Sequence, residues 1–237
     1  MRNIAAIRAY HYLKKRILDG SLKPGDFLSA QGLSRDIGLS RTPVKDALRK
    51  LEYDELVTIE PSLGAAVRVL DQAQFLDLLS YREALEVHAV GCAADFHRAA
   101  DLDRLETVLA RMRAQTEILS QSPYSVRINQ RLADFDFQFH SLLFEMADNR
   151  IIYENFVRAF ELERMMILSL TGSQDHDALK DRAIVALGEH TRIFAAVRDG
   201  DQASARSTMA AHLGRTFAEI VRRSDLQACW PQELVVF

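Results

Sequence analysis

The sequence predicts a mainly α-helical protein, in which an N-terminal winged helix-turn-helix precedes an antiparallel all-α bundle of six to seven helices. Three observations predict this fold. Apolar residues recur at helical spacing along most of the chain. Two short strand-like runs follow the third expected helix. No strand pattern interrupts the chain after Asp71, so the remainder is expected to pack helix on helix.

The first two helices are expected over residues 4–19 and from Ser29 to Ile37. Between them lies a loop with Gly20, Pro24 and Gly25, which are strong breakers of regular structure. Ser29 is a suitable N-cap for the second helix. Gly38 can take the left-handed conformation that ends it.

The third helix has one apolar and one cationic face. Its apolar stripe recurs at i, i+3, i+4 and i+7, and consists of Val44, Ala47, Leu48 and Leu51. Arg41, Lys45 and Arg49 follow at four-residue intervals on the opposite face. A helix of this kind after a helix and a tight turn suits the major groove of DNA. An ordinary solvated helix face is the alternative that charge spacing alone leaves open.

Ser40 or Thr42 is expected to cap this third helix, with Pro43 in its first turn, where the missing N–H costs little. Two strand-like runs then follow, Leu56–Ile59 and Ala66–Val69. A β-hairpin directly after such a helix is a wing. Residues 1–70 therefore form the expected winged helix-turn-helix domain.

The rest of the chain reads as successive helices, which form an expected effector-binding and dimerisation domain of residues 71–226. Asp101 is expected to cap the second helix of this domain, and the last two helices are expected over 179–198 and 203–223. The tail, residues 227–237, is too short to classify.

Composition agrees with two unequal domains in a cytoplasmic protein. The 237 residues are 48% hydrophobic and 27% charged, which is ordinary for globular proteins. No apolar run approaches the ~18 residues that span a bilayer, and the first twenty residues lack a signal-peptide core. Two cysteines are too few for a disulfide framework.

Charge is distributed unevenly between these two parts. Residues 1–70 contain 12 Lys and Arg against 8 Asp and Glu, a net charge of +4. The whole chain has a net charge of −3, so the residues after 70 carry a net charge of −7. A basic module beside a larger acidic one is typical of a nucleic-acid-binding domain attached to a sensing domain.

Three histidines and one carboxylate are expected to face the core of the helical part. Asp136 and His140 are four residues apart on one helix, and His190 and His212 lie on apolar stripes of two others. A lone inward histidine is more often a satisfied core residue than a ligand. Four such groups in one bundle favour a metal site. Imidazole and carboxylate ligands suit Zn²⁺, Ni²⁺ or Mn²⁺ without choosing between them.

Arg82 lies on an otherwise apolar helix face, and a buried arginine needs an anion. One interpretation is a salt bridge with an acid such as Glu86. The other, which we favour, is a bidentate clamp for the carboxylate of an effector.

The N-terminal part closely resembles the winged-helix domain of GntR-type transcription regulators. The residues that carry the resemblance agree in order and spacing: Ile17-Leu18-Asp19-Gly20, Leu22-Lys23-Pro24-Gly25, Leu33, Ser40 to Leu51, Gly64 and Val67. The resemblance assigns DNA contacts to Ser40, Arg41, Thr42, Lys45 and Arg49, and Gly64 is expected to let the wing approach the sugar-phosphate backbone. Ser40 and Thr42 could act only as helix caps, Arg49 is a better backbone contact than base reader, and Gly64 could serve only as a turn residue.

The helical remainder resembles the FCD effector domain of the FadR-type branch. The residues that carry this resemblance are Arg82 to Glu86, Asp136 to His140, Asn149, Glu189-His190 and His212-Leu213. It implies that Asp136, His140, His190 and His212 bind a divalent metal, and that the domain senses a small carboxylate or sugar acid.

Four positions depart from the family pattern. Gln31 stands where an arginine usually contacts DNA, Lys45 replaces a more common arginine, and Leu63 replaces a frequent basic residue of the wing. Glu55 occupies a position usually held by glycine. The fold should survive these changes, whereas the operator sequence is expected to differ.

The leading hypothesis is therefore a homodimeric, effector-responsive regulator, most often a repressor in this family, that binds an inverted-repeat operator and no membrane. The competing hypothesis is a metal-dependent enzyme that acts on a small carboxylate, since an Asp/His₃ site can activate water. No second carboxylate evidently accompanies the ligands as a general base. A DNA-architectural protein without a ligand is the third interpretation.

Overall fold

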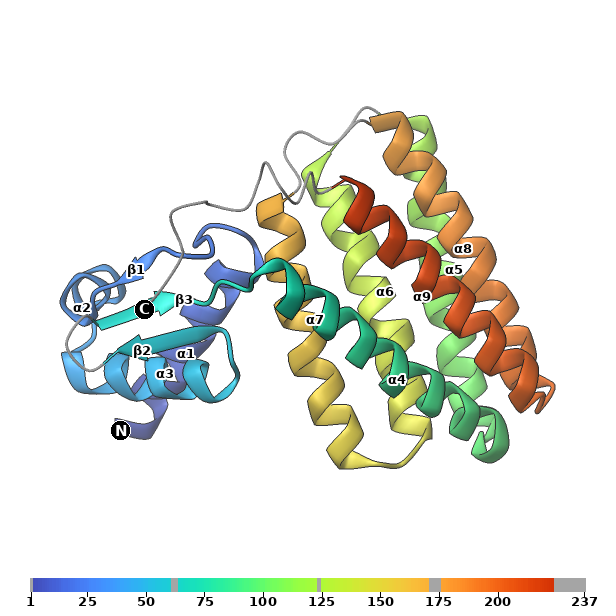
Figure 1. Ribbon diagram of the computed structural model, residues 1–237, viewed down its shortest axis with the longest axis horizontal. Coiled ribbons are helices and arrows are strands. Elements are labelled where there is room, and N and C mark those ends of the chain that lie inside the picture. Colours follow the sequence, from blue (N-terminus) through green and yellow to red (C-terminus); the bar gives the residue numbers. More distant parts are fainter. Residues whose placement is uncertain (1, 61–63, 123–124, 171–175, 224–237) are drawn as a thin grey trace. The chain divides into compact units, whose positions relative to one another are not determined.

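The computed structural model describes residues 2–60, 64–122, 125–170 and 176–223 (Figure 1). In these residues it contains nine helices and one small sheet. The mainly α-helical fold class predicted from the sequence is confirmed, including a winged helix-turn-helix and six further helices.

The helix-turn-helix begins with α1 (Arg2–Leu18), α2 (Ala30–Ile37) and α3 (Arg41–Tyr53). The predicted cap of α2 is confirmed, because Ser29 accepts a hydrogen bond from the backbone N–H of Gly32. Gly38 ends α2 with a φ of 70°, in the left-handed region that favours glycine.

The cap predicted for α3 is wrong in its chemistry. Ser40 occupies the N-cap position, but its side chain makes no capping hydrogen bond in the described residues. Thr42 lies inside the helix, as its second residue. Pro43 lies in the first turn and has no N–H that needs a hydrogen-bond partner. Ser40 itself is exposed.

The wing is a three-stranded antiparallel sheet in the order β1-β3-β2, made of β1 (Phe27–Leu28), β2 (Val57–Glu60) and β3 (Gly64–Val67). The predicted hairpin is present, with each strand displaced by one or two residues. Sequence reasoning missed β1, because a two-residue strand has no measurable alternation. It pairs with β3 through Phe27 opposite Ala66 and Leu28 opposite Ala65.

Glu55, which replaces the usual glycine, has a φ of 64°. This left-handed conformation explains the glycine of the family pattern, since a Cβ is strained there. The Glu55 carboxylate forms an ion pair with Arg68, one residue beyond β3. The departure is therefore accommodated without loss of the turn.

The helical part contains α4 (Gln72–Phe96), α5 (Ala99–Gln121), α6 (Val126–Met146), α7 (Arg150–Leu170), α8 (His176–Arg198) and α9 (Gln202–Arg223). The helices α5 and α6, α8 and α9, and α5 and α8 pack side by side (Figure 1). Phe75, Phe139, Phe144 and Phe156 are the largest fully buried side chains of the chain's described residues.

Two local predictions in this part need correction. Asp101 does not cap α5, which begins at Ala99 after the N-cap residue Arg98. Asp101 is its third residue, and its carboxylate accepts a hydrogen bond from the backbone N–H of Arg98 in a capping box. The helix α8 begins at His176, three residues before the expected start at Leu179, so that His176 and Asp177 are helical and not part of a loop expected over 171–177. Residues 171–175 of that loop lie outside the described residues.

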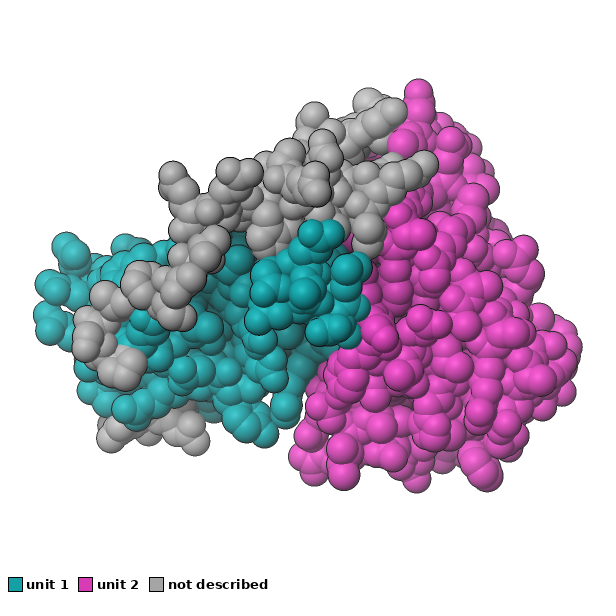
Figure 2. Space-filling model, in the orientation of Figure 1, with its two compact units in different colours: residues 1–78, 158–172, 224–237 teal, residues 79–157, 173–223 magenta. Residues whose placement is uncertain are grey.

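By packing, the chain divides into two compact units, shown in different colours in Figure 2. We call the unit of residues 1–78 with 158–172 the winged-helix unit, and that of residues 79–157 with 173–223 the helical unit. Within the winged-helix unit, Lys14 of α1 forms an ion pair with Glu161 of α7 at 2.7 Å. The boundaries 1–70 and 71–226 remain a prediction, and the tail 227–237 lies outside the described residues.

Candidate functional sites: a cationic helix and a histidine cluster

The two faces of α3 separate as the sequence predicted. Val44, Ala47, Leu48 and Leu51 are between 0% and 4% exposed. Arg41, Lys45 and Arg49 are exposed on the other side, as are Ser40 and Thr42 at the start of the helix. This row of cations has the spacing and exposure that a helix in the major groove requires.

Gly64 is required at the start of β3 for two reasons. Its φ is 111°, which L-residues with a side chain rarely adopt. A Cβ at this position would also lie 2.8 Å from Cε2 of the Phe27 ring. Glycine therefore fits this position for structural reasons, and its predicted contact with DNA remains a prediction.

The four predicted metal ligands meet in the helical unit. Asp136 and His140 project from α6, His190 from α8 and His212 from α9. One ligand atom from each lies within 4.8 Å of all the others. The Nε2 atoms of His140 and His190 are 3.2 Å apart, and Asp136 Oδ1 lies 3.3 Å from His190 Nε2. All three histidines are buried, whereas the Asp136 side chain is 33% exposed.

These distances fit a bound divalent ion. Ligand bonds of about 2.0–2.2 Å place any two donor atoms at most ~4.4 Å apart. The cluster needs to contract by only about half an ångström to meet this limit. Two imidazole Nε2 atoms that face each other at 3.2 Å can both act as acceptors only if a cation lies between them. The donor set therefore suits a metal.

Arg82 and Glu86 of α4 form a buried pair next to the cluster. Arg82 donates from Nε and Nη2 to Glu86 Oε1, at 2.8 and 2.6 Å. The other carboxylate oxygen, Oε2, contacts Nδ1 of His140. The Arg82 guanidinium also lies 5.9 and 5.7 Å from the ring centroids of Phe156 and Phe217. The salt bridge that the sequence left open is thus present.

Electrostatics keeps the Glu86 carboxylate ionised. Burial raises the pKa of Glu86, but Arg82 and His140 outweigh this effect and lower the pKa to about 2. Burial likewise lowers the pKa of His140, and the Glu86 carboxylate outweighs it, so that this pKa lies above its ordinary value. Burial, with His212 and His140 nearby, holds the pKa of His190 well below its usual range, so His190 is neutral.

A second glutamate supports His212. Glu189 Oε2 lies 2.8 Å from His212 Nδ1, and Arg215 Nε donates to Glu189 Oε1 at 2.6 Å. Burial raises the pKa of Glu189, while its hydrogen bonds to His212 and Arg215 lower it to about 2. Because Nδ1 of His212 faces the glutamate, Nε2 is the nitrogen left for the cluster.

Sequence reasoning missed the contacts that Glu86 and Glu189 make with the histidines. The sequence indicates Glu86 only as a partner of Arg82, four residues earlier on the same helix. Its contact with His140 joins α4 to α6, and that of Glu189 joins α8 to α9. The one available signal was the His212/Arg215 spacing of three residues, which puts both side chains on one face of α9.

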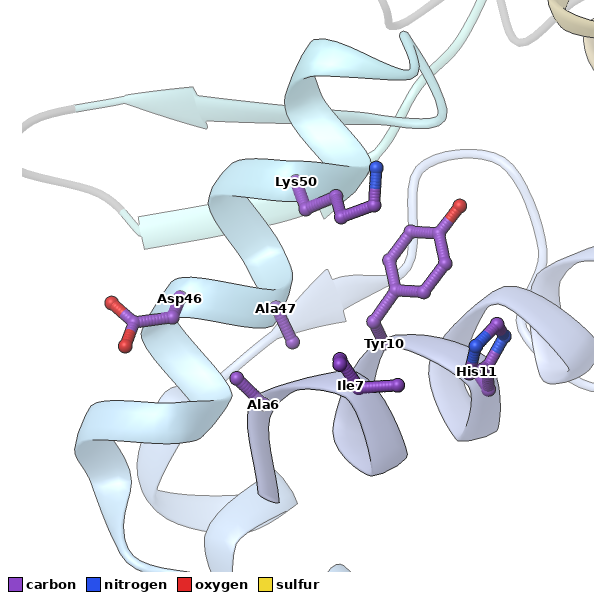
Figure 3. A pocket seen from close by; sticks show the side chains of 7 residues that line it. All are labelled: Ala6, Ile7, Tyr10, His11, Asp46, Ala47 and Lys50. Atoms are coloured by element: carbon purple, nitrogen blue, oxygen red, sulfur yellow. The ribbon is translucent and has the colours of Figure 1, made fainter. Parts of the chain in front are cut away.

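A separate open groove of about 620 Å³ lies in the winged-helix unit, between α1 and α3 (Figure 3). Its lining is mostly apolar, with Asp46 and Lys50 on the α3 side and His11 on the α1 side. Neither Arg82 nor any residue of the histidine cluster lines it. It is therefore distinct from the predicted effector and metal site.

Fold and site together define the chain as a winged helix-turn-helix protein with a second, helical domain that contains the histidine cluster. Residues 5–67 match the gntR family of bacterial regulatory proteins, and residues 77–215 match the FCD domain. The chain belongs to this family of GntR transcription regulators with an FCD domain. None of the described helices is long and apolar enough to cross a bilayer.

Relatives and solved structures agree with this assignment. The chain is 29% identical to the uncharacterized HTH-type transcriptional regulator YdhC of Bacillus subtilis, over 87% of this chain and 86% of YdhC. It is 28% identical to the HTH-type transcriptional repressor RspR of Escherichia coli, over 90% and 87% of the two chains. The structure of E. coli McbR/YncC shares the fold, with a TM-score of 0.75 and 19% identity over 92% and 98% of the chains.

Proposed function

We propose that this regulator is a homodimeric repressor whose binding to an inverted-repeat operator is controlled by a small organic acid held at a divalent metal. The observation that carries this proposal is the convergence of Asp136, His140, His190 and His212 within 4.8 Å, in a chain that also presents an exposed cationic helix. Dimerisation would place two such helices on the two half-sites of a repeat.

On the DNA side, the proposed contacts come from the start and exposed face of α3 and from the wing. Arg41, at the start of the helix, can form a bidentate contact with guanine O6 and N7. Lys45, one turn later, contacts a base or phosphate as a point charge. Arg49, Ser40 and Thr42 contact phosphates, and Gly64 allows the wing to approach the sugar-phosphate backbone.

In the helical unit, Asp136, His140, His190 and His212 would hold Zn²⁺, Ni²⁺ or Mn²⁺. A six-coordinate ion bound by four protein atoms has two positions left, which suit two oxygens of a carboxylate or sugar acid. Arg82 is the proposed clamp for the effector carboxylate. Because Glu86 already accepts two hydrogen bonds from Arg82, an effector would have to share this guanidinium with Glu86.

A metal-dependent enzyme is the weaker proposal. The ion could activate water, but hydrolysis also needs a carboxylate or histidine positioned as a general base. Glu86 is engaged by Arg82 and His140, and Glu189 by Arg215 and His212. Their lowered pKa values also make them weak bases. Turnover of an organic acid by the metal-loaded protein would favour the enzyme.

The DNA assignment is tested by selection of binding sites from random duplexes, with the wild type and the Arg41→Ala variant. We expect an inverted repeat for the wild type. For the variant we expect a loss of about 1–3 kcal/mol of discrimination at one base pair of each half-site. Arg113→Ala, which removes an exposed arginine of α5, is the matched control. Wild-type discrimination by Arg41→Ala would contradict the assignment.

The effector assignment is tested by a thermal-shift screen of carboxylates and sugar acids, with metal-loaded and chelator-treated protein. We expect at least one acid to raise the melting temperature only when metal is bound. An acid that binds the metal-free protein with unchanged affinity would contradict a role for the metal.

A further inference from the structure

Two of the three clustered histidines are backed by a carboxylate on the nitrogen away from the cluster. His140 Nδ1 contacts Glu86 Oε2, and His212 Nδ1 lies 2.8 Å from Glu189 Oε2. Each glutamate comes from a different helix than its histidine. These contacts therefore fix the imidazoles relative to the bundle, rather than within one helix.

Each glutamate is held in turn by an arginine. Arg82 donates twice to Glu86 Oε1, and Arg215 donates to both oxygens of Glu189. The helical unit thus repeats one arrangement: arginine, glutamate, histidine, cluster. An anchored carboxylate holds the proton of its histidine on Nδ1, and so presents the Nε2 lone pair to the cluster.

The two arrangements differ in their exposure to water. The Arg82 and Glu86 side chains are 5% and 1% exposed, whereas those of Arg215 and Glu189 are 33% and 10% exposed. The attraction between a carboxylate and its polar or charged partners is stronger where water is excluded. The buried arrangement on α4 should therefore orient its histidine more firmly than the arrangement between α8 and α9.

We propose that Glu86 and Glu189 are positioning residues for the metal centre, held by Arg82 and Arg215, and that Glu86 contributes the larger share of metal affinity. This proposal rests on the proposed metal binding, and it adds residues that do not touch the ion. Outer-shell partners of this kind typically change metal affinity by about 10- to 100-fold.

The test compares the full chain with three variants. Glu189→Gln removes the charge of the more exposed glutamate. Glu86→Asp keeps the charge beside buried Arg82, which Glu86→Gln would leave unpaired, but withdraws the carboxylate from His140 by one methylene. Glu106→Gln removes an exposed charge from α5 and is the matched control. Metal-free melting temperatures and far-UV circular dichroism establish that each variant folds.

Zinc affinity is measured by competition with a chromogenic chelator. We expect about a 10-fold loss for Glu189→Gln, a loss nearer 100-fold for Glu86→Asp, and none for Glu106→Gln. Nitrogen-15 NMR of the zinc-loaded protein provides a readout that general destabilisation would not reproduce. In Glu189→Gln the Nδ1–H signal of His212 should shift and that of His140 should stay in place. In Glu86→Asp the signal of His140 should shift and that of His212 should stay in place.

Folded variants that bind zinc like the wild type, with unmoved Nδ1–H signals, would overturn this inference and leave the metal centre intact. A larger loss for Glu189→Gln than for Glu86→Asp would overturn the ranking of the two. A wild-type chain that binds none of zinc, nickel and manganese would overturn the proposed metal centre, and this inference with it.

Discussion

The winged-helix unit and the helical unit place their functional side chains in opposite ways. Arg41, Lys45 and Arg49 stand in water on a helix whose other face is apolar. His140, His190 and His212 are buried, and two of them are held by charged groups that are themselves buried or half-buried. The proposed partners would account for the difference, because DNA phosphates are contacted at the protein surface, whereas a metal ion is enclosed by its ligands.

This contrast determines what a substitution should do in each unit. An exposed cation can be removed with little effect on stability, so that its loss reports on DNA binding alone. A buried charged group of the helical unit is part of the packing, so that its loss affects folding as well as function.

The largest effect is expected for Arg82→Ala. The substitution leaves the Glu86 carboxylate buried without its strongest partner, which typically costs about 3–5 kcal/mol. Urea unfolding measures this change. Arg113→Ala, an exposed arginine of the same unit, should stay within about 0.5 kcal/mol of the wild type. A loss below 1 kcal/mol for Arg82→Ala would contradict the expected difference in stability effect between buried and exposed charged groups.

The winged-helix unit also contains one buried polar link, between the Tyr10 hydroxyl and Asp54 Oδ2 at 2.5 Å. Burial, followed by the hydrogen bond to Asp54, raises the pKa of Tyr10 to about 12. The pKa of Tyr10 in the folded protein lies above the ordinary value of 10.0. Its contribution to the free energy of unfolding is therefore complete below pH 10 and is lost as the pH rises towards 12.

Between pH 10 and 12 the wild type should lose no more than about 2–3 kcal/mol of its free energy of unfolding as Tyr10 ionises. The Tyr10→Phe variant should not show this loss. Urea unfolding across this range measures it, and Tyr12→Phe, at an exposed tyrosine of α1, is the control. If the wild type and Tyr10→Phe lost equal free energy of unfolding over this pH range, the hydrogen bond between Tyr10 and Asp54 would contribute nothing to stability.

The smallest effect is expected for Arg49→Ala. As a phosphate contact, Arg49 should weaken binding about equally for all duplexes and reduce the slope of log affinity against log salt by about one. Stability should remain within about 0.5 kcal/mol of the wild type. Anisotropy titrations of one specific and one random duplex at several salt concentrations measure both the affinity and its dependence on salt. Loss of discrimination between duplexes would instead make Arg49 a base reader.

The same contrast explains how much the sequence could predict. The stripe of Val44, Leu48 and Leu51 and the cap at Ser29 are local patterns, and both are confirmed. The four clustered residues were predicted because each lies on an inward helix face. Their mutual distances, and the contact of Glu86 with His140, depend on how helices pack, which spacing within one helix does not encode.

Local rules also failed in identifiable places. Asp101 has the chemistry of an N-cap but acts as the third residue of α5, because the helix begins at Ala99, after the N-cap residue Arg98. The strand β1 is created by its pairing with β3, and not by its own two residues. Glu55 takes a left-handed φ that its residue type disfavours, and only the family's usual glycine pointed to it.

We propose that the buried centre of the helical unit controls DNA binding by the exposed helix α3. The most direct test of this control is the affinity for the selected operator, measured by fluorescence anisotropy with and without the carboxylate found by thermal shift, in metal-loaded and chelator-treated protein. We predict that the carboxylate changes operator affinity at least about 10-fold in the metal-loaded protein only, a coupling of about 1.4 kcal/mol. The same change in metal-free protein, or none in either, would contradict the claim.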